Sequence, residues 1–391
     1  MQRRIFDSDH EAFRDSCRTF VDRRLRPDQE KHIADHGFGR QMWLDLGRQG
    51  FLGLHVPEEY GGSGVQDPRF MVVLSEELSK LAFAYSSCVG IHADCVAPYL
   101  VELGTPEQKE RWLPRFCSGE LVTAIAMTEP SGGSDLAALR TTAVRDGDGW
   151  VLNGSKTFIT NGYSADLVVV AARTSPEKGA RGITLFAVET GMPGFERGRR
   201  LEKIGQPESD TAELFFADVR LGDEQVIGEV DAGFGAMMDR LVTERIGAAV
   251  NNLAQARQIL EETLDHVRER HAFGQPVGTF QANRFTLAEL VTRAEVTQAH
   301  LDACVMEQVA GTLSAVDAAK AKWWAADTQN LILDACVQLY GGYGYMSEYR
   351  VARAWADARV SRIWAGSNEI MKEIIGRDLG LGGPPVKARA H

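Results

Sequence analysis

The stretch Met127-Thr128-Glu129-Pro130-Ser131-Gly132-Gly133-Ser134-Asp135 stands where the character of the sequence changes. Before it, from about residue 7 to residue 120, the pattern is helical, and Thr105-Pro106-Glu107-Gln108 has the form of a capping box with proline at the first helical position. The stretch itself crowds glycines and hydroxyl side chains into a loop. Glycines let a backbone approach a ligand closely, and Thr and Ser offer hydrogen bonds without bulk. Taken alone, the loop is best explained as a plain turn.

Strand patterns follow this loop from about residue 141 to residue 189. The run Trp150-Val151-Leu152-Asn153-Gly154-Ser155-Lys156 predicts a hairpin with Asn-Gly at its turn. Residues 167–172 form a continuous apolar run typical of a buried strand, and residues 183–188 and 212–216 predict two more strands. Mostly β structure therefore separates two helical blocks.

Helical periodicity returns from Gly233 onward. Four helices are expected, which is the number that a bundle needs; they span residues 243–270, 281–311, 313–338 and 368–379. The run Gly341-Gly342-Tyr343-Gly344-Tyr345 ends the third of them. The pattern predicts an α+β fold with an N-terminal α-helical domain (residues 1–120), a central small β-barrel-like domain (121–232) and a C-terminal four-helix bundle (233–391).

Composition narrows the class of protein. Of the 391 residues, 44% are hydrophobic and 25% charged, which is ordinary for a globular chain, and the net charge of −11 disfavours nucleic acid as a partner. The six cysteines form no Cys-x-x-Cys pair and no histidine cluster has metal spacing, so we expect free thiols in a reducing compartment and no metal. No apolar run approaches the ~20 residues of a membrane helix, and the short basic tail Lys387–His391 is typical of a solvated end. We expect a soluble cytoplasmic protein without a membrane partner.

The segment Thr157-Phe158-Ile159-Thr160-Asn161-Gly162 is the second candidate for ligand binding. An aromatic side chain two residues before a hydroxyl, at a strand end, can pack on a planar ring while the hydroxyl bonds its edge. The alternative is a core phenylalanine and a turn-capping threonine, which is commoner for a lone motif. No Gly-x-Gly-x-x-Gly follows a strand, so a Rossmann dinucleotide site has no support.

In their order and spacing, the two candidate segments together resemble the flavin-binding signature of the acyl-CoA dehydrogenases. Three more blocks follow in that family's order: Glu269–Pro276, Gln338–Tyr345 and Ser361–Ile370. The resemblance covers nearly the whole chain and is closest to the long-chain and isovaleryl-type branch. It implies FAD-dependent α,β-dehydrogenation of an acyl-CoA thioester, with electrons passed to an electron-transfer flavoprotein. It also implies a homotetramer, built as a dimer of dimers.

The resemblance assigns a role to individual positions. Thr128 and Thr160 would bond the flavin ring, and Phe158, where many members have tryptophan, would pack beside it. Ser367 and Glu369 match positions on the adenosine side. Five positions match residues that reach the FAD of a neighbouring subunit: Arg270, Phe273, Gln281, Gln338 and Gly342. Met127 and Ser134 complete the flavin set, and Ser134, Leu241 and Gly366 are expected to contact the acyl-CoA.

The catalytic base is the most informative assignment. Ala365 stands where many members of the family carry their catalytic glutamate, and the long-chain and isovaleryl-type branches keep theirs in a Glu-Arg pair that matches Glu244-Arg245. Removing a proton alpha to a thioester requires a carboxylate in a dry site with a raised pKa. From the residues alone, Glu244 is equally well explained as a first-turn carboxylate that interacts with the helix dipole; the resemblance favours catalysis. Arg245 would support it, and the Ala365 backbone N–H would bind the thioester oxygen.

Two other functions remain open on the same fold. One is a flavin oxidase or monooxygenase, which uses oxygen and in some relatives lacks the glutamate. The other is a non-catalytic member that binds nucleic acid or a protein, and the net charge opposes it. Fold does not determine substrate, but the branch resemblance favours long or branched acyl groups.

Overall fold

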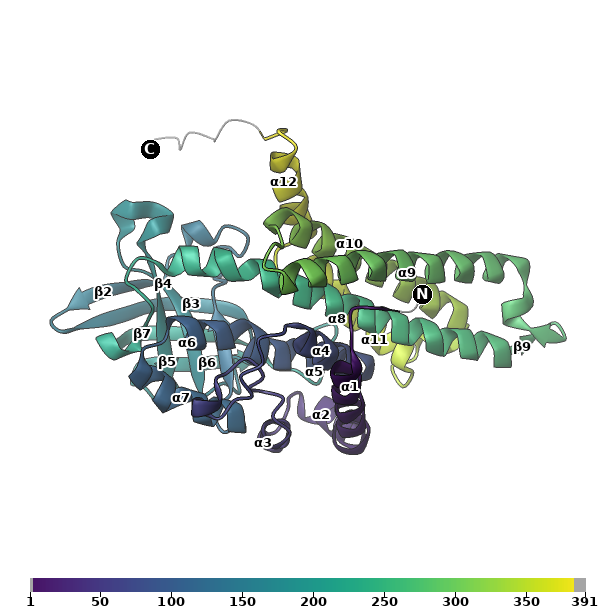
Figure 1. Ribbon diagram of the computed structural model, residues 1–391, viewed down its shortest axis with the longest axis horizontal. Coiled ribbons are helices and arrows are strands. Elements are labelled where there is room, and N and C mark those ends of the chain that lie inside the picture. The colour runs from purple at the N-terminus through teal and green to yellow at the C-terminus, as the bar shows by residue number, and fades with distance from the viewer. Residues whose placement is uncertain (1–2, 383–391) are drawn as a thin grey trace.

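Helices fill the first part of the chain, strands the middle and long helices the last part, as the sequence predicts (Figure 1). The computed structural model describes residues 3–382, and the basic tail Lys387–His391 lies outside them. The first block contains α1 (Ser8–Phe20), α2 (Gln29–Asp35), α3 (Arg40–Arg48), α4 (Arg69–Leu81), α5 (Phe83–Gly90), α6 (Ala97–Leu103) and α7 (Pro106–Ser118). A π-helical turn, η4 (Ile91–Val96), joins α5 to α6.

The capping box is present at the start of α7. The hydroxyl of Thr105 accepts a hydrogen bond from the Gln108 backbone N–H at 3.3 Å, and the Gln108 side chain accepts one from the Thr105 N–H at 2.9 Å. The same Gln108 side chain donates to the carbonyl of Val226 at 2.7 Å. This residue therefore also ties the helical block to the sheet.

Eight strands form one sheet in the order β6-β7-β3-β2-β4-β5-β8, with β1 paired in parallel to β4. Their bounds are β1 (Thr123–Ala126), β2 (Thr142–Asp146), β3 (Gly149–Thr160), β4 (Leu167–Arg173), β5 (Ile183–Glu189), β6 (Phe195–Arg200), β7 (Thr211–Gly222) and β8 (Val226–Ile227). The strands expected at residues 167–172, 183–188 and 212–216 are all present as β4, β5 and part of β7.

The hairpin expected at Asn153-Gly154 is wrong. Strand β3 continues through both residues, and the turn lies earlier, at Gly147, whose φ is +60°. Gly154 instead marks a shift of register between β3 and β7, where a Cβ atom would lie 2.5 Å from the Thr141 hydroxyl oxygen. An Asn-Gly pair is favoured in bulges as well as in turns, because both need unusual backbone angles.

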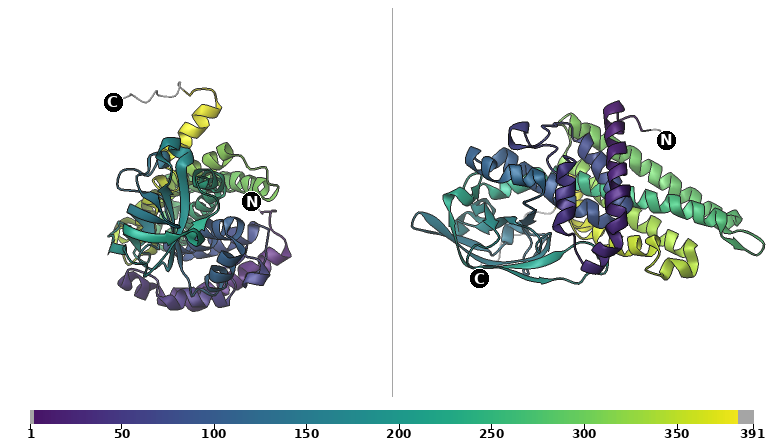
Figure 2. Two further views of the ribbon diagram at one scale, coloured as in Figure 1. Left: turned by 90° about the vertical axis from the view of Figure 1, so that its left-hand side faces the viewer. Right: turned by 90° about the horizontal axis from the view of Figure 1, so that it is seen from below.

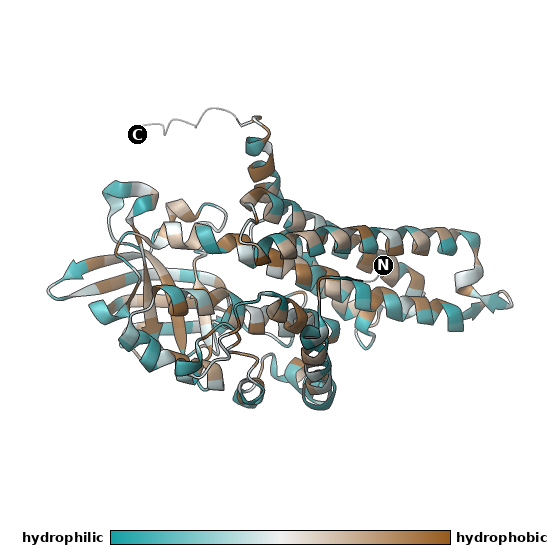
Figure 3. Ribbon diagram, in the orientation of Figure 1, coloured by the Kyte–Doolittle hydropathy of each residue, from teal (hydrophilic) through white to brown (hydrophobic). Residues whose placement is uncertain are grey.

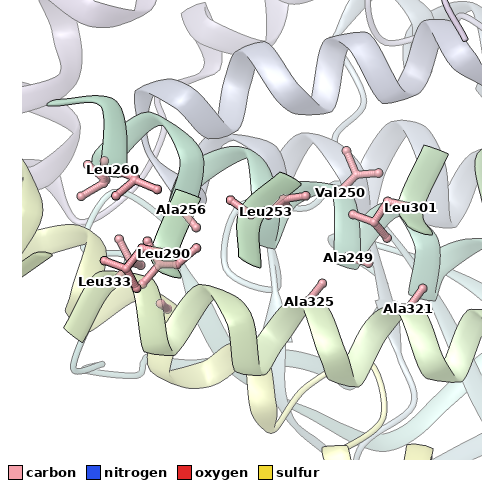
Figure 4. Packing of buried hydrophobic residues seen from close by; sticks show 14 of the residues in the cluster. Ala249, Val250, Leu253, Ala256, Leu260, Leu290, Leu301, Ala321, Ala325 and Leu333 are labelled. Atoms are coloured by element: carbon pink, nitrogen blue, oxygen red, sulfur yellow. The ribbon is translucent and has the colours of Figure 1, made fainter. Parts of the chain in front are cut away.

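The last block is built on α8 (Gly233–Glu269), α9 (Gln281–Val309), α10 (Ala315–Tyr340) and α12 (Asn368–Asp378). A hairpin of β9 (His271–Ala272) and β10 (Gln275–Pro276) joins α8 to α9, and a short turn, η9 (Gly341–Tyr345), with α11 (Arg350–Ala358) joins α10 to α12. Apolar and polar residues alternate along these helices (Figure 3), as expected for helices with one buried face. Figure 4 shows the resulting core, in which Leu253 of α8, Leu290 of α9 and Leu333 of α10 are buried.

Helix α8 begins at Gly233, ten residues before the expected start at Thr243. The glycine-rich start resembles a loop in sequence, but Gly233 packs on the sheet, where a Cβ atom would lie 3.0 Å from the carbonyl of Ile183. Met237 is buried in the core beneath the sheet, so one helix of roughly 55 Å, at 1.5 Å per residue, crosses from the sheet to the bundle (Figure 1). Glu244 therefore lies inside the helix, and the first-turn dipole explanation for it is wrong.

Candidate active site

Glu244 is a half-buried carboxylate in the interior of α8. Its Oε1 atom is closed to solvent and has no hydrogen-bond partner among residues 3–382. Burial raises the pKa of Glu244 to about 8, and the nearby Asp94 carboxylate adds to the rise, while Arg245 and Arg240 oppose it. A carboxylate in this state is a base that can accept a proton near neutral pH.

The surroundings of Glu244 are dry. Ile246, Ala249 and Val250 on the following turns are buried in the bundle core, where Figure 4 labels Ala249 and Val250. On the other side, the buried hydroxyl of Tyr99 has no hydrogen-bond partner among the described residues, and burial together with Glu244 raises its pKa. Four of the six residues that follow Glu244 are buried and the other two are half-buried.

The turn at Ala365 and Gly366 has a left-handed backbone, with φ of +50° and +82°. That conformation is strained for alanine, and such strain is common where a backbone group serves a ligand. The Ala365 N–H has no hydrogen-bond acceptor within residues 3–382. It is therefore free to donate to a substrate oxygen.

Lys322 of α10 holds this turn from behind. Its side chain is fully buried, and its Nζ donates to the Gly366 carbonyl at 2.5 Å. Burial lowers the pKa of Lys322 to about 8, and repulsion from Arg245 lowers it further. Lys322 therefore lies between the Ala365 turn, which it contacts through Gly366, and Arg245, the residue that follows Glu244. Nothing in the sequence singled out Lys322, because the alanine-rich run Ala318–Ala326 also contains Lys320.

A second group of residues lies at the edge of the sheet. Glu129, in the loop that follows β1, is buried and pairs with the fully buried Lys156 of β3 at 2.8 Å. Glu129 also accepts hydrogen bonds from the backbone N–H groups of Arg140 and Thr141 at 2.6 and 2.9 Å. These bonds lower the pKa of Glu129 to about 2 against the effect of burial. Sequence analysis quoted both residues without recognising this buried pair.

The Glu129–Lys156 pair holds the loop against β3, the strand that carries the expected flavin-binding residues Phe158 and Thr160. Lys156 donates to the carbonyl of Met127 at 3.2 Å, and the Thr157 N–H donates to the carbonyl of Thr128 at 2.9 Å. The strand then bulges between Lys156 and Ile159. Such bulges re-aim side chains near functional sites.

Phe158 stands on this bulge with φ of +59° and is 69% exposed. It is therefore not a core residue, and the core-phenylalanine alternative is wrong. Thr160 is half-buried at the end of the strand, and the hydroxyls of Thr128 and Thr160 have no partners among the described residues. Unused hydroxyls beside an exposed aromatic ring fit the edge and face of a planar flavin. Ser134 is exposed on the same loop.

The five positions expected to reach a neighbouring subunit lie elsewhere. Arg270, Phe273, Gln281, Gln338 and Gly342 are all exposed, and Phe273 is 96% exposed with φ of +52°. They gather at the end of the bundle around β9 and η9, while the sheet lies at the opposite end of the long axis (Figures 1 and 2). One chain does not bring them to Thr128 and Phe158.

Two further expected residues lie at the start of α12. Ser367 is the N-cap of this helix and accepts a hydrogen bond from the Ile370 N–H at 3.3 Å, while Glu369 is exposed in the first turn. Leu241 is half-buried on α8, three residues before Glu244.

Across residues 3–382, no helix has the length and apolar character needed to cross a membrane, and no cluster of side chains could bind a metal ion.

Three family models match the chain in sequence order. They are described as the N-terminal domain (residues 7–120), the middle domain (residues 124–219) and the C-terminal domain (residues 231–380) of acyl-CoA dehydrogenase. The long-chain specific acyl-CoA dehydrogenase of Rattus norvegicus is 44% identical over 96% of this chain and 88% of its own length. The isovaleryl-CoA dehydrogenase of Solanum tuberosum is 35% identical over 96% of this chain and 91% of its own length.

Solved structures agree with these sequence relatives. An acyl-CoA dehydrogenase from Geobacillus kaustophilus is 43% identical and superposes with a TM-score of 0.95 over 97% of this chain and all of the other. A glutaryl-CoA dehydrogenase from Mycobacterium smegmatis, solved in complex with FADH2, is 28% identical with a TM-score of 0.91, over 97% of each chain.

Proposed function

The chain belongs to the acyl-CoA dehydrogenase family, and we propose that it oxidises an acyl-CoA thioester between its α and β carbons with Glu244 as the base. The observation that carries this assignment is the unpartnered Oε1 of Glu244 in a dry site. Because its pKa lies near 8, Glu244 can take the α proton at neutral pH and hold it in the product complex.

Other residues provide the remaining contacts to the thioester oxygen and to the flavin ring. The free N–H of Ala365 donates to the thioester oxygen, where negative charge develops as the α proton leaves. The positive charges of Lys322 and Arg245 lie close by and favour that charge. FAD bound at this site would supply the hydride acceptor for the β carbon. Thr128, Phe158 and Thr160 are the residues that would hold its ring.

The dehydrogenase is favoured over the flavin oxidase or monooxygenase because the buried carboxylate is retained. In the dehydrogenase, electrons pass on to an electron-transfer flavoprotein. The identity to long-chain and isovaleryl-CoA dehydrogenases supports long or branched acyl groups as the starting set of substrates. All six cysteines are unpaired, which supports a reducing compartment, and we place the protein in the cytoplasm.

A homotetramer, a dimer of dimers, is part of the same proposal. The exposed side chains at the β9 end, Phe273 above all, need a covering surface. A flavin bound at Phe158 lacks the contacts that Arg270 and Gln338 would supply from a second chain. The cofactor site would then be completed only on assembly, so FAD binding would stabilise the oligomer by mass action.

The test is anaerobic reduction of the purified protein. We expect a yellow protein with about one FAD per chain. Its absorbance should bleach on addition of an acyl-CoA and return only slowly in air. A protein that takes up no FAD, or whose flavin no acyl-CoA reduces, would refute the proposal; rapid reoxidation in air would establish the oxidase instead.

A further inference from the structure

This inference rests on the proposed dehydrogenation and concerns its substrate: we propose that Asp94 selects an acyl chain that carries a hydroxyl group a few carbons beyond the reacting carbons. Asp94 lies on η4, which packs against α8. Its Oδ2 atom is only 2.8 Å from the point where a Cβ atom on residue 247 would lie. Gly247 is thus small so that this carboxylate can reach α8.

The position of Asp94 relative to the base follows from helix geometry. Gly247 comes three residues after Glu244, so it is on the same face and roughly 4.5 Å further along the helix axis. The proximity of the two carboxylates is also seen in the effect of Asp94 on the pKa of Glu244. An acyl chain whose α carbon meets Glu244 and which runs on along α8 reaches Asp94 after a few more carbons.

A small pocket opens at this point between α4, η4, α8 and the end of α9. Asp94, Ser75, Thr243 and Gln308 give it polar walls, while Met71, Val72 and Val250 are among its apolar ones. Its free volume of about 20 Å³ is enough for one small polar group. The far end of the proposed acyl-chain site therefore has both polar and apolar walls, whereas a site for a plain alkyl chain needs only apolar ones.

Three of the four polar side chains in this pocket have no hydrogen-bond partner among residues 3–382, while Thr243 donates to the Arg240 carbonyl at 2.9 Å. Ser75 is only 6% exposed, yet its hydroxyl has no hydrogen-bond partner within residues 3–382. The Asp94 carboxylate forms no hydrogen bond or ion pair with the described residues, and the Gln308 amide is likewise unused. Asp94 and Gln308 are half-buried, so water can reach them in the free protein, and covering such a group without giving it a partner carries a desolvation cost. A plain alkyl chain that entered the pocket would impose that cost.

A hydroxyl suits the charges around Asp94. The facing carboxylate is Glu244, and the basic group within electrostatic reach is His55, whose Nδ1 lies 2.9 Å from the Val65 carbonyl. Burial raises the pKa of Asp94, and His55 opposes the rise. A hydroxyl pairs with either form of the carboxyl, and its second partner would be Ser75.

The experiment compares anaerobic flavin bleaching by matched pairs of acyl-CoAs. Each pair has the same chain length, without and with a hydroxyl on the last carbon, and lengths increase through the series. A third arm carries an amine in place of the hydroxyl. At the best length, we expect kcat/KM for the hydroxylated chain to exceed that of the plain chain at least ~10-fold, since sites built to bond a hydroxyl reject analogues that lack it.

Variants of Asp94 and Ser75 test whether the preference for a hydroxylated acyl chain comes from this pocket. Asp94→Leu should bring the ratio of hydroxylated to plain substrate close to one, and Asp94→Asn should keep most of it because an amide still donates and accepts. Ser75→Ala should lower the ratio in part and keeps the test available if Asp94→Leu fails to bind FAD. Asp15→Asn, an exposed site on α1, is the matched control and should leave the ratio unchanged.

The possible results distinguish a failure of the proposed dehydrogenation from a failure of the proposed role of Asp94. If no acyl-CoA bleaches the flavin, the proposed dehydrogenation itself fails. If plain chains bleach it as fast as hydroxylated ones, or the ratio survives Asp94→Leu, only the selection by Asp94 is overturned. Preference for the amine over the hydroxyl would also overturn the hydroxyl assignment.

Discussion

Replacing Glu244 with glutamine separates its catalytic role from its effect on stability. The amide keeps the shape of the side chain but cannot accept the α proton, so flavin bleaching by acyl-CoA should fall at least ~10²-fold. FAD content and acyl-CoA binding should stay near those of the wild-type protein, because Glu244 Oε1 bonds to no other group among the described residues.

The same change should stabilise the folded protein, by an amount that depends on pH. The pKa of Glu244 rises from an ordinary value of 4.5 to about 8 in the folded chain. A carboxyl with a raised folded pKa contributes its full stability below pH 4.5 and loses it as pH rises through 8. The loss is about 1.4 kcal/mol per pH unit between these values, or at most about 5 kcal/mol in total. Glutamine has no such loss.

Thermal unfolding of both proteins at equal concentration, from about pH 5 to about pH 9, measures this effect. The advantage of Glu244→Gln should be absent near pH 5, widen as pH rises and stop widening above about pH 8. Asp15→Asn, which removes an exposed carboxylate, should show no such widening. A constant difference in Tm across this range would refute the buried, raised-pKa carboxylate, and wild-type bleaching by Glu244→Gln would refute it as the base.

Three further predictions follow from other contacts. The kcat/KM of the wild-type enzyme should fall about tenfold per pH unit below about pH 8, because Glu244 becomes protonated there. In Asp94→Asn the fall should begin at a lower pH, because a charge that raises the pKa of Glu244 is removed. Glu129→Gln should destabilise the fold by about 3–5 kcal/mol in denaturant titrations and weaken FAD binding, since Lys156 is left buried without its carboxylate. Arg270→Ala should lower both FAD occupancy and oligomer size in gel filtration; a fully FAD-loaded monomer of the wild-type chain would contradict the shared site.

The role of Glu244 could be predicted only in part from the sequence. Glu244 and the absence of a carboxylate at Ala365 could be identified because motif order places them, and motif order is a property of the chain alone. The competing first-turn explanation could not be dismissed at that stage. The structure excludes the first-turn explanation, because Gly233 packs on the sheet and α8 begins there, well before Glu244.

The order of helical and β blocks and most element positions could be predicted from the sequence, because periodicity and capping act between neighbours in the chain; the family could be predicted from the order of its motifs. The Asn153-Gly154 hairpin failed because a turn and a bulge share the same residue preferences, and the pairing of β3 with β7 decides between them. Three features could be seen only in the folded chain: the burial of Lys322 under Gly366, the pairing of Glu129 with Lys156 and the approach of Asp94 to α8. Each joins residues from separate elements, and the pKa of a carboxylate depends on the water and charge that such neighbours remove or supply.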